Sequence, residues 1–189
     1  MANRKGKTEL FAQWIKGSLV INDQRVTTGT RYYVHSGTGS SSNSGLGPDD
    51  PLDTIDAGIN KCTASKSDIV YVMPGHAENV TTATGINADV KGVSIIGLGS
   101  GSLVPTVSYT AAAGSLTVGA ADVTIENIKF VANFATGTTT GITIATAGDG
   151  CTIRNCKFRD TSAANEFLKH ISVATTVTDL LISGCSFVT

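Results

Sequence analysis

Glu126 and Arg154 are the first candidates for surface chemistry in this chain, because they occupy the same position of two matching segments. Residues 123–130 read VTIENIKF and residues 151–158 read CTIRNCKF, so the segments correspond position by position. If the copies stack, Glu126 and Arg154 form an ion pair, worth less than about 1 kcal/mol where it is exposed. A glycosidase or a calcium site requires several carboxylates on one face, whereas no outward position of the repeat carries two. We therefore expect no catalytic site, no metal and no cofactor, and a protein that is not an enzyme.

Three aspartates and two lysines recur with the same spacing. Asp122, Asp149 and Asp179 fall at or just before the start of a repeat, where aspartate is a common turn residue, so we expect them to be structural. Lys129 and Lys157 occupy matching positions of the two segments. Stacking would place these lysines side by side, either as a mild repulsion or as a contact for an anion.

Histidines and glycines that resemble functional motifs also favour structural roles. Residues 75–78 (GHAE) place one histidine beside one glutamate at a turn, and His35 and His170 have no ligand partners at metal spacing. Residues 97–101 (GLGSG) would have to open a helix in order to cradle a dinucleotide, but Pro105 follows shortly after them. None of these residues is expected to bind a ligand.

The four cysteines are Cys62, Cys151, Cys156 and Cys185, and no pair has the CxxC spacing of a zinc site. Cys156 and Cys185 hold equivalent positions of successive repeats, so stacking would bring their backbones close enough to bridge. Parallel inward thiols usually behave as small hydrophobic groups. We expect them to be reduced, in keeping with assembly in a cytoplasm.

A repeat of about 28 residues must position these side chains. Its copies begin at residues 70, 93, 123, 151 and 180, in steps of 23, 30, 28 and 29. Val123 and Ile125 alternate with polar residues as in a strand, and the alternation slips at Asn127, so two short strands meet there at a corner. The residues at equivalent corners tolerate left-handed backbone angles: Gly97, Asn127, Asn155 and Gly184.

A third strand recurs at residues 86–88, 116–118, 142–144 and 171–173. Three short strands in each repeat describe one coil of a parallel β-helix, in which like residues stack about 4.8 Å apart. Three inner columns follow from this register: Ile95, Ile125, Ile153 and Ile182; Leu98, Ile128, Cys156 and Cys185; and Phe130, Phe158 and Phe187.

The segment before the coils contains a strand, a loop and a helix. Residues 31–34 alternate as a strand, and residues 36–50 have the composition of a long flexible loop. Asp50 can act as N-cap for a helix with Pro51 at its first position. The helical face would carry Leu52, Ile55, Ile59 and Cys62. Such a helix is suited to cap the exposed first coil.

This opening module resembles that of right-handed parallel β-helix proteins of the pectate-lyase-like superfamily. The resemblance rests on YYV (32–34), SGTG (36–39), residues 43–51, residues 54–59 and DIVYVMPG (68–75), and it covers residues 31–189. It implies an all-β, right-handed, single-stranded parallel β-helix with about five coils. Modules of this kind occur in bacteriophage virion proteins and in polysaccharide enzymes, so the resemblance specifies the fold better than the function. The paired-Asp, GHG and RxK patterns of polygalacturonase-like relatives are absent.

Residues 1–30 do not fit the repeat and form an extended N-terminal arm in our interpretation. Residues 1–31 have a net charge of +4, whereas the remainder has −5. A basic arm on an acidic body indicates docking, although a solvated tail and a cover for the open end of the coils stay as alternatives. The expected partner-binding residues are basic, aromatic or apolar: Arg4, Lys5, Lys7, Phe11, Trp14, Ile15 and Lys16.

We therefore divide the chain into an attachment arm (1–30), a strand, loop and capping helix (31–67) and the coils (68–189). The chain lacks a secretory signal and a run of about 20 apolar residues, so we expect neither a membrane nor a nucleic-acid partner. Among the functions that the resemblance implies, the short length, the basic arm with its aromatic residues and the missing catalytic constellation favour a structural virion protein of a tailed bacteriophage, made in the host cytoplasm. It would be a capsid decoration (cement) protein, or a head or tail spike, bound to the major capsid protein or another virion protein.

A homotrimer is implied by the resemblance to phage β-helices. The alternatives are a polysaccharide-degrading or polysaccharide-binding protein, such as a tailspike that recognises a host-surface polysaccharide, and a bacterial surface adhesin. Thr189 ends the given chain in the middle of a coil. An apolar coil end requires cover, so we expect either further chain or a neighbouring subunit there.

Overall fold

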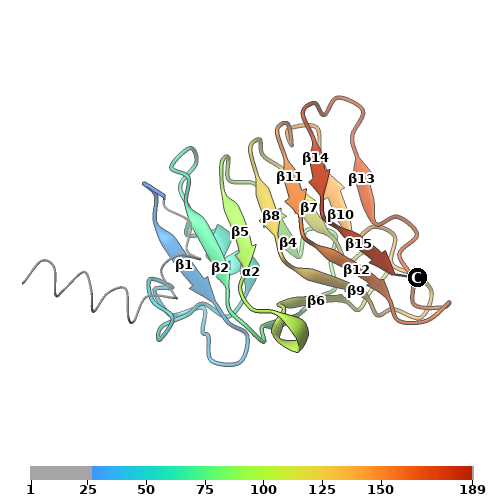
Figure 1. Ribbon diagram of the computed structural model, residues 1–189, viewed down its shortest axis with the longest axis horizontal. Coiled ribbons are helices and arrows are strands. Elements are labelled where there is room, and N and C mark those ends of the chain that lie inside the picture. The colour runs from blue at the N-terminus through green and yellow to red at the C-terminus, as the bar shows by residue number, and fades with distance from the viewer. Residues whose placement is uncertain (1–26, 189) are drawn as a thin grey trace, which may run out of the picture.

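The computed structural model describes residues 27–188, which form an all-β parallel solenoid of about four turns with almost no helix (Figure 1). The first sheet contains β1 (Arg31–Val34), β2 (Ile69–Val72), β5 (Ser94–Gly97), β8 (Thr124–Glu126), β11 (Thr152–Arg154) and β14 (Leu181–Ser183). The second contains β3 (Ala77–Val80), β6 (Thr106–Tyr109), β9 (Lys129–Ala132), β12 (Lys157–Asp160) and β15 (Ser186–Val188). The third contains β4 (Ile86–Ala88), β7 (Leu116–Val118), β10 (Ile142–Ile144) and β13 (Ile171–Val173).

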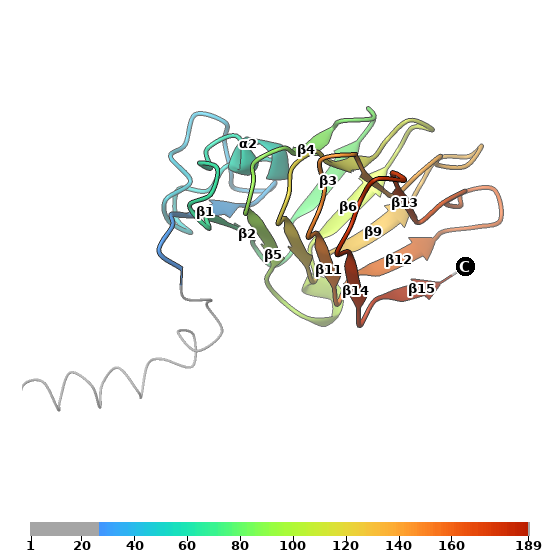
Figure 2. The same cartoon turned by 90° about the horizontal axis from the view of Figure 1, so that it is seen from above.

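Each full turn contributes one strand to each sheet, and every neighbouring strand pair is parallel (Figure 2). The turns start at β2, β5, β8 and β11. The expectation of about five coils was too high, because the last repeat supplies only β14 and β15 within the described residues. The four third strands, by contrast, lie where the repeat predicted them, in register from β4 to β13.

The inner columns of the sequence repeat are confirmed by the strand register. Ile95 is paired with Ile125, Ile125 with Ile153, and Ile153 with Ile182. The first three of these isoleucines are fully buried in the main core. Such burial of a branched side chain contributes about 1.5–3 kcal/mol per residue.

The phenylalanine column is confirmed as well. The ring centroids of Phe130 and Phe158 lie 5.2 Å apart, and those of Phe158 and Phe187 lie 5.0 Å apart, with near-parallel planes. Leu98 departs from its predicted column, because it packs on the outside of the first sheet with Ile96 and Tyr71. The chain leaves the corner at Gly97–Gly99 differently from later turns, and the 3₁₀ helix η2 (Gly101–Leu103) follows.

The corner residues adopt the backbone angles that the sequence predicted, with one exception. The φ angles are 53° at Asn127, 54° at Asn155 and 62° at Gly184. Gly97 does not have a positive φ; a Cβ there would lie 2.1 Å from the Asn127 carbonyl oxygen. Position 97 therefore requires glycine because the backbone of Asn127 lies so close to it, and not because the position needs a left-handed angle.

A second column of left-handed residues lies where each turn begins. Asp122 and Asp179 have φ of 60° and 55°, and the equivalent residues Gly92 and Gly150 have φ of 77° and 68°. The two aspartates thus occupy turns, as expected. Asp149 also stabilises this corner, since its carboxylate accepts hydrogen bonds from the backbone N–H and hydroxyl of Thr178 at 2.7 and 3.2 Å.

The helix before the coils is shorter than predicted and starts later. Helix α2 spans Ile55–Ile59, and its N-cap is Thr54, whose hydroxyl accepts from the Ala57 N–H at 3.1 Å. The prediction of Asp50 as N-cap was wrong. The Asp50 carboxylate instead accepts from the backbone N–H and hydroxyl of Ser44, and these hydrogen bonds hold its pKa below the usual value.

Helix α2 packs against β4, β1 and β2 and buries Ile55 and Ile59 in the main core. The preceding loop, predicted to be flexible, carries a hydrogen-bond network. The Asn43 amide donates to the Pro51 carbonyl at 2.8 Å, and Leu52 is fully buried. Residues 27–30, which fall within the predicted arm, lie against the first full turn, where the Thr30 N–H donates to Asp68 Oδ1.

Replacing an inward isoleucine tests the stacked core. Ile125→Ala should lower the free energy of unfolding by about 3 kcal/mol, because it leaves a cavity between two packed neighbours. Thr124→Ala, one residue away and half-exposed, should cost less than about 1 kcal/mol. Chemical denaturation followed by circular dichroism measures both changes, and equal losses for the two variants would contradict the inward column.

Candidate functional site

The predicted ion pair between adjacent turns is present. Arg154 Nη2 donates to Glu126 Oε2 at 3.0 Å, and the two residues are paired in register on β11 and β8. Both side chains are partly exposed, so the pair contributes less than about 1 kcal/mol. Lys129 and Lys157 are also in register, as the repeat predicted. Four charged residues thus flank the corner between the first and second sheets: the ion pair on the first sheet and the two lysines on the second.

A shallow groove runs along this corner. We call it the corner groove, and it is lined by Ile96, Gly97, Leu98, Gly99, Glu126, Asn127 and Asn155. The Asn127 amide donates to the carbonyls of Gly97 at 2.8 Å and Gly99 at 3.1 Å, which fixes the glycine loop as one wall. An apolar floor beside amide and carboxylate groups is suited to a hydroxyl-rich ligand.

The corner groove contains one carboxylate rather than a pair. Glu126 is its only acidic lining residue, and that carboxylate already accepts from Arg154. General acid–base hydrolysis of a glycosidic bond needs two carboxyl groups at a defined separation. Within residues 27–188, no cluster of three or more His, Cys, Asp or Glu side chains could hold a metal ion. The groove geometry therefore fits binding better than that form of catalysis.

A second groove lies on the third sheet and is rich in hydroxyl groups. It is lined by Ala83, Thr84, Ala113, Ser115, Thr117, Thr139, Thr140 and Thr143. The Ser115 and Thr143 hydroxyl oxygens lie 3.1 Å apart, and the Thr117 hydroxyl donates to the Ala83 carbonyl. These bonds between neighbouring turns use the hydroxyls to hold the stack together.

The buried His76 and Glu78 pair joins the start of the coils to helix α2. His76 Nδ1 accepts from the Ser36 N–H at 3.0 Å, so Nε2 carries the proton and donates to Glu78 Oε2 at 3.0 Å. The same Glu78 oxygen accepts from the Ile55 N–H at 3.0 Å. Glu78 is in register with Val107 and thus stands at the N-terminal end of the phenylalanine column. These contacts are structural.

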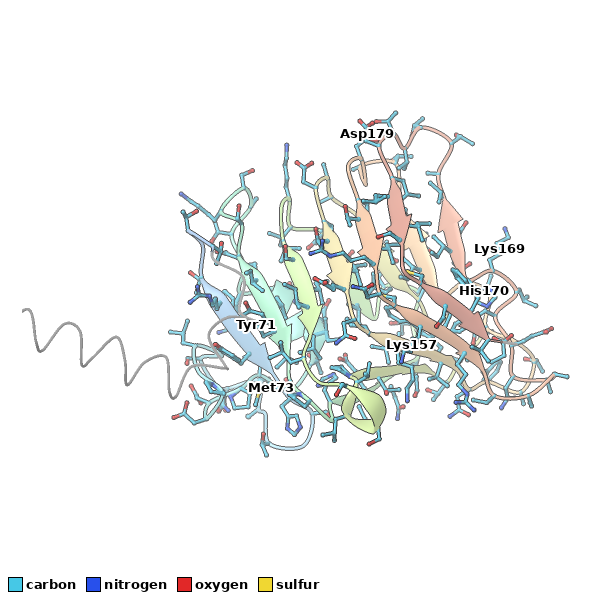
Figure 3. The ribbon with its side chains drawn as sticks, in the orientation of Figure 1. Tyr71, Met73, Lys157, Lys169, His170 and Asp179 are labelled. Atoms are coloured by element: carbon cyan, nitrogen blue, oxygen red, sulfur yellow. The ribbon has the colours of Figure 1, made fainter. Side chains whose placement is uncertain are left out.

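The other two histidines have different surroundings. The His35 ring bonds the Thr38 hydroxyl at 2.9 Å. The His170 ring packs among three phenyl rings, with centroid distances of 5.8 Å to Phe158, 5.5 Å to Phe167 and 5.1 Å to Phe187. Lys169 and His170 lie toward the C-terminal end of the stack (Figure 3).

The C-terminal end of the stack is open within the described residues. By this term we mean β13, β14 and β15, each of which pairs with a neighbour on one side only. Ile182 and Phe187 continue inner columns whose earlier members are buried, yet they are 42% and 48% exposed. Leu181 and Val188 are also exposed. Unpaired strand edges beside exposed core residues form a surface suited to another chain.

Sequence reasoning missed an apolar cluster on the outer face of the first sheet. Its members are Tyr33, Ile69, Tyr71, Ile96 and Leu98. The Tyr33 and Tyr71 ring centroids lie 5.6 Å apart, and all four residues of β2 are buried. The uninterrupted apolar run of residues 69–72 is the signal, since a strand covered on both faces loses its alternation.

The predicted partner-binding residues lie outside the described part of the chain. They are Arg4, Lys5, Lys7, Phe11, Trp14, Ile15 and Lys16. Among residues 27–188, no helix has the length and apolar content needed to cross a bilayer.

No protein-family model matches the chain, and no curated protein sequence does. A solved structure described as "Rhamnogalacturonan lyase" has a similar fold, with a TM-score of 0.56 and 16% sequence identity. The match covers 84% of this chain and 51% of that one, so the chain spans about half the length of the neighbour. At this identity the likeness shows the fold alone, a parallel β-solenoid.

Removing Glu78 tests the structural reading of the buried pair. Glu78→Ala should destabilise the fold by about 2 kcal/mol, because the His76 Nε2–H and the Ile55 N–H lose their common acceptor. Glu126→Ala removes a carboxylate from the surface pair and should cost less than about 1 kcal/mol. Thermal and chemical unfolding of both variants provides the comparison. A Glu78 variant as stable as the Glu126 variant would contradict the role assigned to this carboxylate.

Proposed function

We propose that this protein is a structural component of a tailed-phage virion, either a capsid decoration protein or a head or tail spike. The N-terminal arm supports the proposal, since a basic segment that carries aromatic residues is suited to docking on a partner. Ile182 and Phe187 end two core columns in solvent beside three unpaired strand edges of the described residues. Such a surface is costly to leave uncovered, and either further chain or a neighbouring subunit would cover it.

The two ends of the stack differ, and this difference supports a closed assembly. At the N-terminal end, α2 packs against β1, β2 and β4, and the Ile55 N–H donates to Glu78; in our proposal these contacts cap the first turn. A capped end is a poor acceptor for the open end of another copy, so head-to-tail growth into a filament is disfavoured. Contacts between open ends of a few copies produce a finite oligomer, and a homotrimer is the state we propose.

Attachment to the particle is assigned to the N-terminal arm. Its net charge of +4 over residues 1–31 opposes the −5 of the remainder, and its Trp14 and Phe11 are residue types common among interface anchors. The proposed partner is the major capsid protein or another virion protein. The solenoid then projects from the particle surface.

A second candidate function is binding of a host-surface polysaccharide. The observation that favours it is the corner groove, in which Asn127, Asn155 and Glu126 border an apolar floor. The structural neighbour is described as a lyase, which is compatible with a saccharide ligand for this fold. Retention of the protein on an acidic polysaccharide, with loss of retention in Asn155→Ala, would favour this candidate over the first.

Deleting the arm tests attachment. A chain that lacks residues 1–26 keeps the Thr30 hydrogen bond to Asp68 and should fold, yet it should lose at least about 90% of its co-sedimentation with empty capsids. The physical reason is removal of the basic and aromatic anchors. Lys5→Glu with Lys7→Glu in the full chain serves as the charge control. Unchanged particle binding by the truncated chain would overturn the attachment assignment.

Charging the open end tests assembly. Phe187→Asp places a carboxylate on the exposed core column and should convert the oligomer to a monomer in analytical ultracentrifugation. Ser186→Asp adds the same charge to the neighbouring outward position of β15 and should leave the oligomer largely intact. If the native chain sediments as a monomer at all concentrations, the open end is not an interface.

A further inference from the structure

Two cysteine side chains meet at the open C-terminal end. Lys157 and Ser186 are paired in register on β12 and β15, so Cys156 and Cys185, one residue earlier, lie in adjacent turns. The two side chains thus occupy equivalent inward positions of neighbouring turns. Each thiol also lies near the carbonyl of the preceding turn, Cys156 near Ile125 at 3.8 Å and Cys185 near Ile153 at 3.7 Å.

This placement satisfies the main requirement of a disulfide. Adjacent parallel strands are about 4.8 Å apart, which falls within the Cα separation of roughly 4.4–6.8 Å that disulfides allow. All four cysteines are free thiols in the structure. Cys156 is buried, whereas Cys185 is half-buried, so Cys185 is the more accessible of the two thiols in the described structure.

We propose that Cys156 and Cys185 are an oxidisable pair that a low-molecular-weight disulfide converts into a covalent link between the last two turns. The inference is separate from the virion proposal and needs only the single chain. It assigns Cys185 as the attacking thiolate and Cys156 as the resolving thiol.

The reaction proceeds by two exchanges. The Cys185 thiolate attacks one sulfur of the reagent disulfide, forms a mixed disulfide and releases one reagent thiolate. Cys156 then loses its proton to solvent and attacks Cys185 Sγ, which forms the protein disulfide and releases the second reagent thiolate. Two protein thiols are oxidised, and one reagent disulfide is reduced to two thiols.

The surroundings of the two sulfurs support these roles. The neighbouring Cys156 thiol, together with backbone hydrogen bonds, lowers the pKa of Cys185. The neighbouring Cys185 sulfur and burial raise the pKa of Cys156. Once Cys185 is in a mixed disulfide its negative charge is gone, and the largest cause of the raised pKa of Cys156 disappears with it.

The remaining cysteines are internal controls. Burial is the largest cause that raises the pKa of Cys62 to about 12, and burial raises the pKa of Cys151 to about 11. Both remain protonated at neutral pH and attack disulfides slowly. The proposal therefore predicts reaction at one pair among four cysteines.

The test uses the full chain at a concentration where it sediments as a single species, with oxidised glutathione at pH 7.5. After alkylation and trypsin digestion, mass spectrometry should find residues 155–157 linked to residues 170–189, with Cys62 and Cys151 alkylated. The oxidised chain should melt about 5–10 °C higher than the reduced chain. The initial rate should fall by clearly less between pH 7.5 and pH 5 than that of an ordinary thiol, which would lose about 300-fold.

Matched serine variants separate the two roles. Cys156→Ser should stop at a glutathione adduct on Cys185, Cys185→Ser should leave Cys156 unmodified, and Cys151→Ser should react like the native chain. Circular dichroism of each variant establishes that it is folded. A native chain that halts at the adduct, or a Cys185→Ser chain that reacts at Cys156 at the native rate, overturns the proposal.

Discussion

The structure depends on register between successive turns. Because each turn must return to the same position about 4.8 Å further along the axis, like side chains stack on like, as Ile95, Ile125 and Ile153 do. The left-handed corners make this return possible, since each bends the chain from a strand of the first sheet into a strand of the second. Asn127 and Asn155 adopt nearly the same φ. A shift of one residue at either corner would turn the inward column toward solvent.

The column of inward side chains in the second sheet ends differently at the two ends of the stack. At the first turn the column of Phe130 and Phe158 ends in Glu78, whose carboxylate accepts hydrogen bonds from His76 and from the N-terminus of α2. At the last turn the column ends in the exposed ring of Phe187. The polar groups of the first end are thus satisfied within the chain, whereas the last described turn leaves an apolar ring exposed.

Much of the fold was predictable from the sequence, because the repeat states the register directly. Apart from Leu98 and Gly97, the columns, the corners and the ion pair between Glu126 and Arg154 followed from aligned positions. The start of α2 did not, because Asp50 and Thr54 are both good caps and only tertiary contacts choose between them. The inward Glu78 also eluded the pattern, since a carboxylate in a core column becomes acceptable only when distant donors reach it.

The corner groove was predictable only in part. Glu126, Asn127 and Asn155 belong to the repeat, but the wall formed by Gly97 and Gly99 depends on a departure of one turn from that repeat. The departure moves Leu98 to the outside of the first sheet. A local break in symmetry thus creates this recess, and sequence periodicity by itself describes only the symmetric part.

The constant register also means that the length of the solenoid grows by a fixed amount with each turn. Because residues 123–150 form one complete lap between equivalent corners, duplicating or deleting such a unit would change the axial length by about 4.8 Å and leave both termini of the stack chemically as they were. Gene segments of this size can therefore set the reach of the molecule in fixed increments, independently of how either end is anchored.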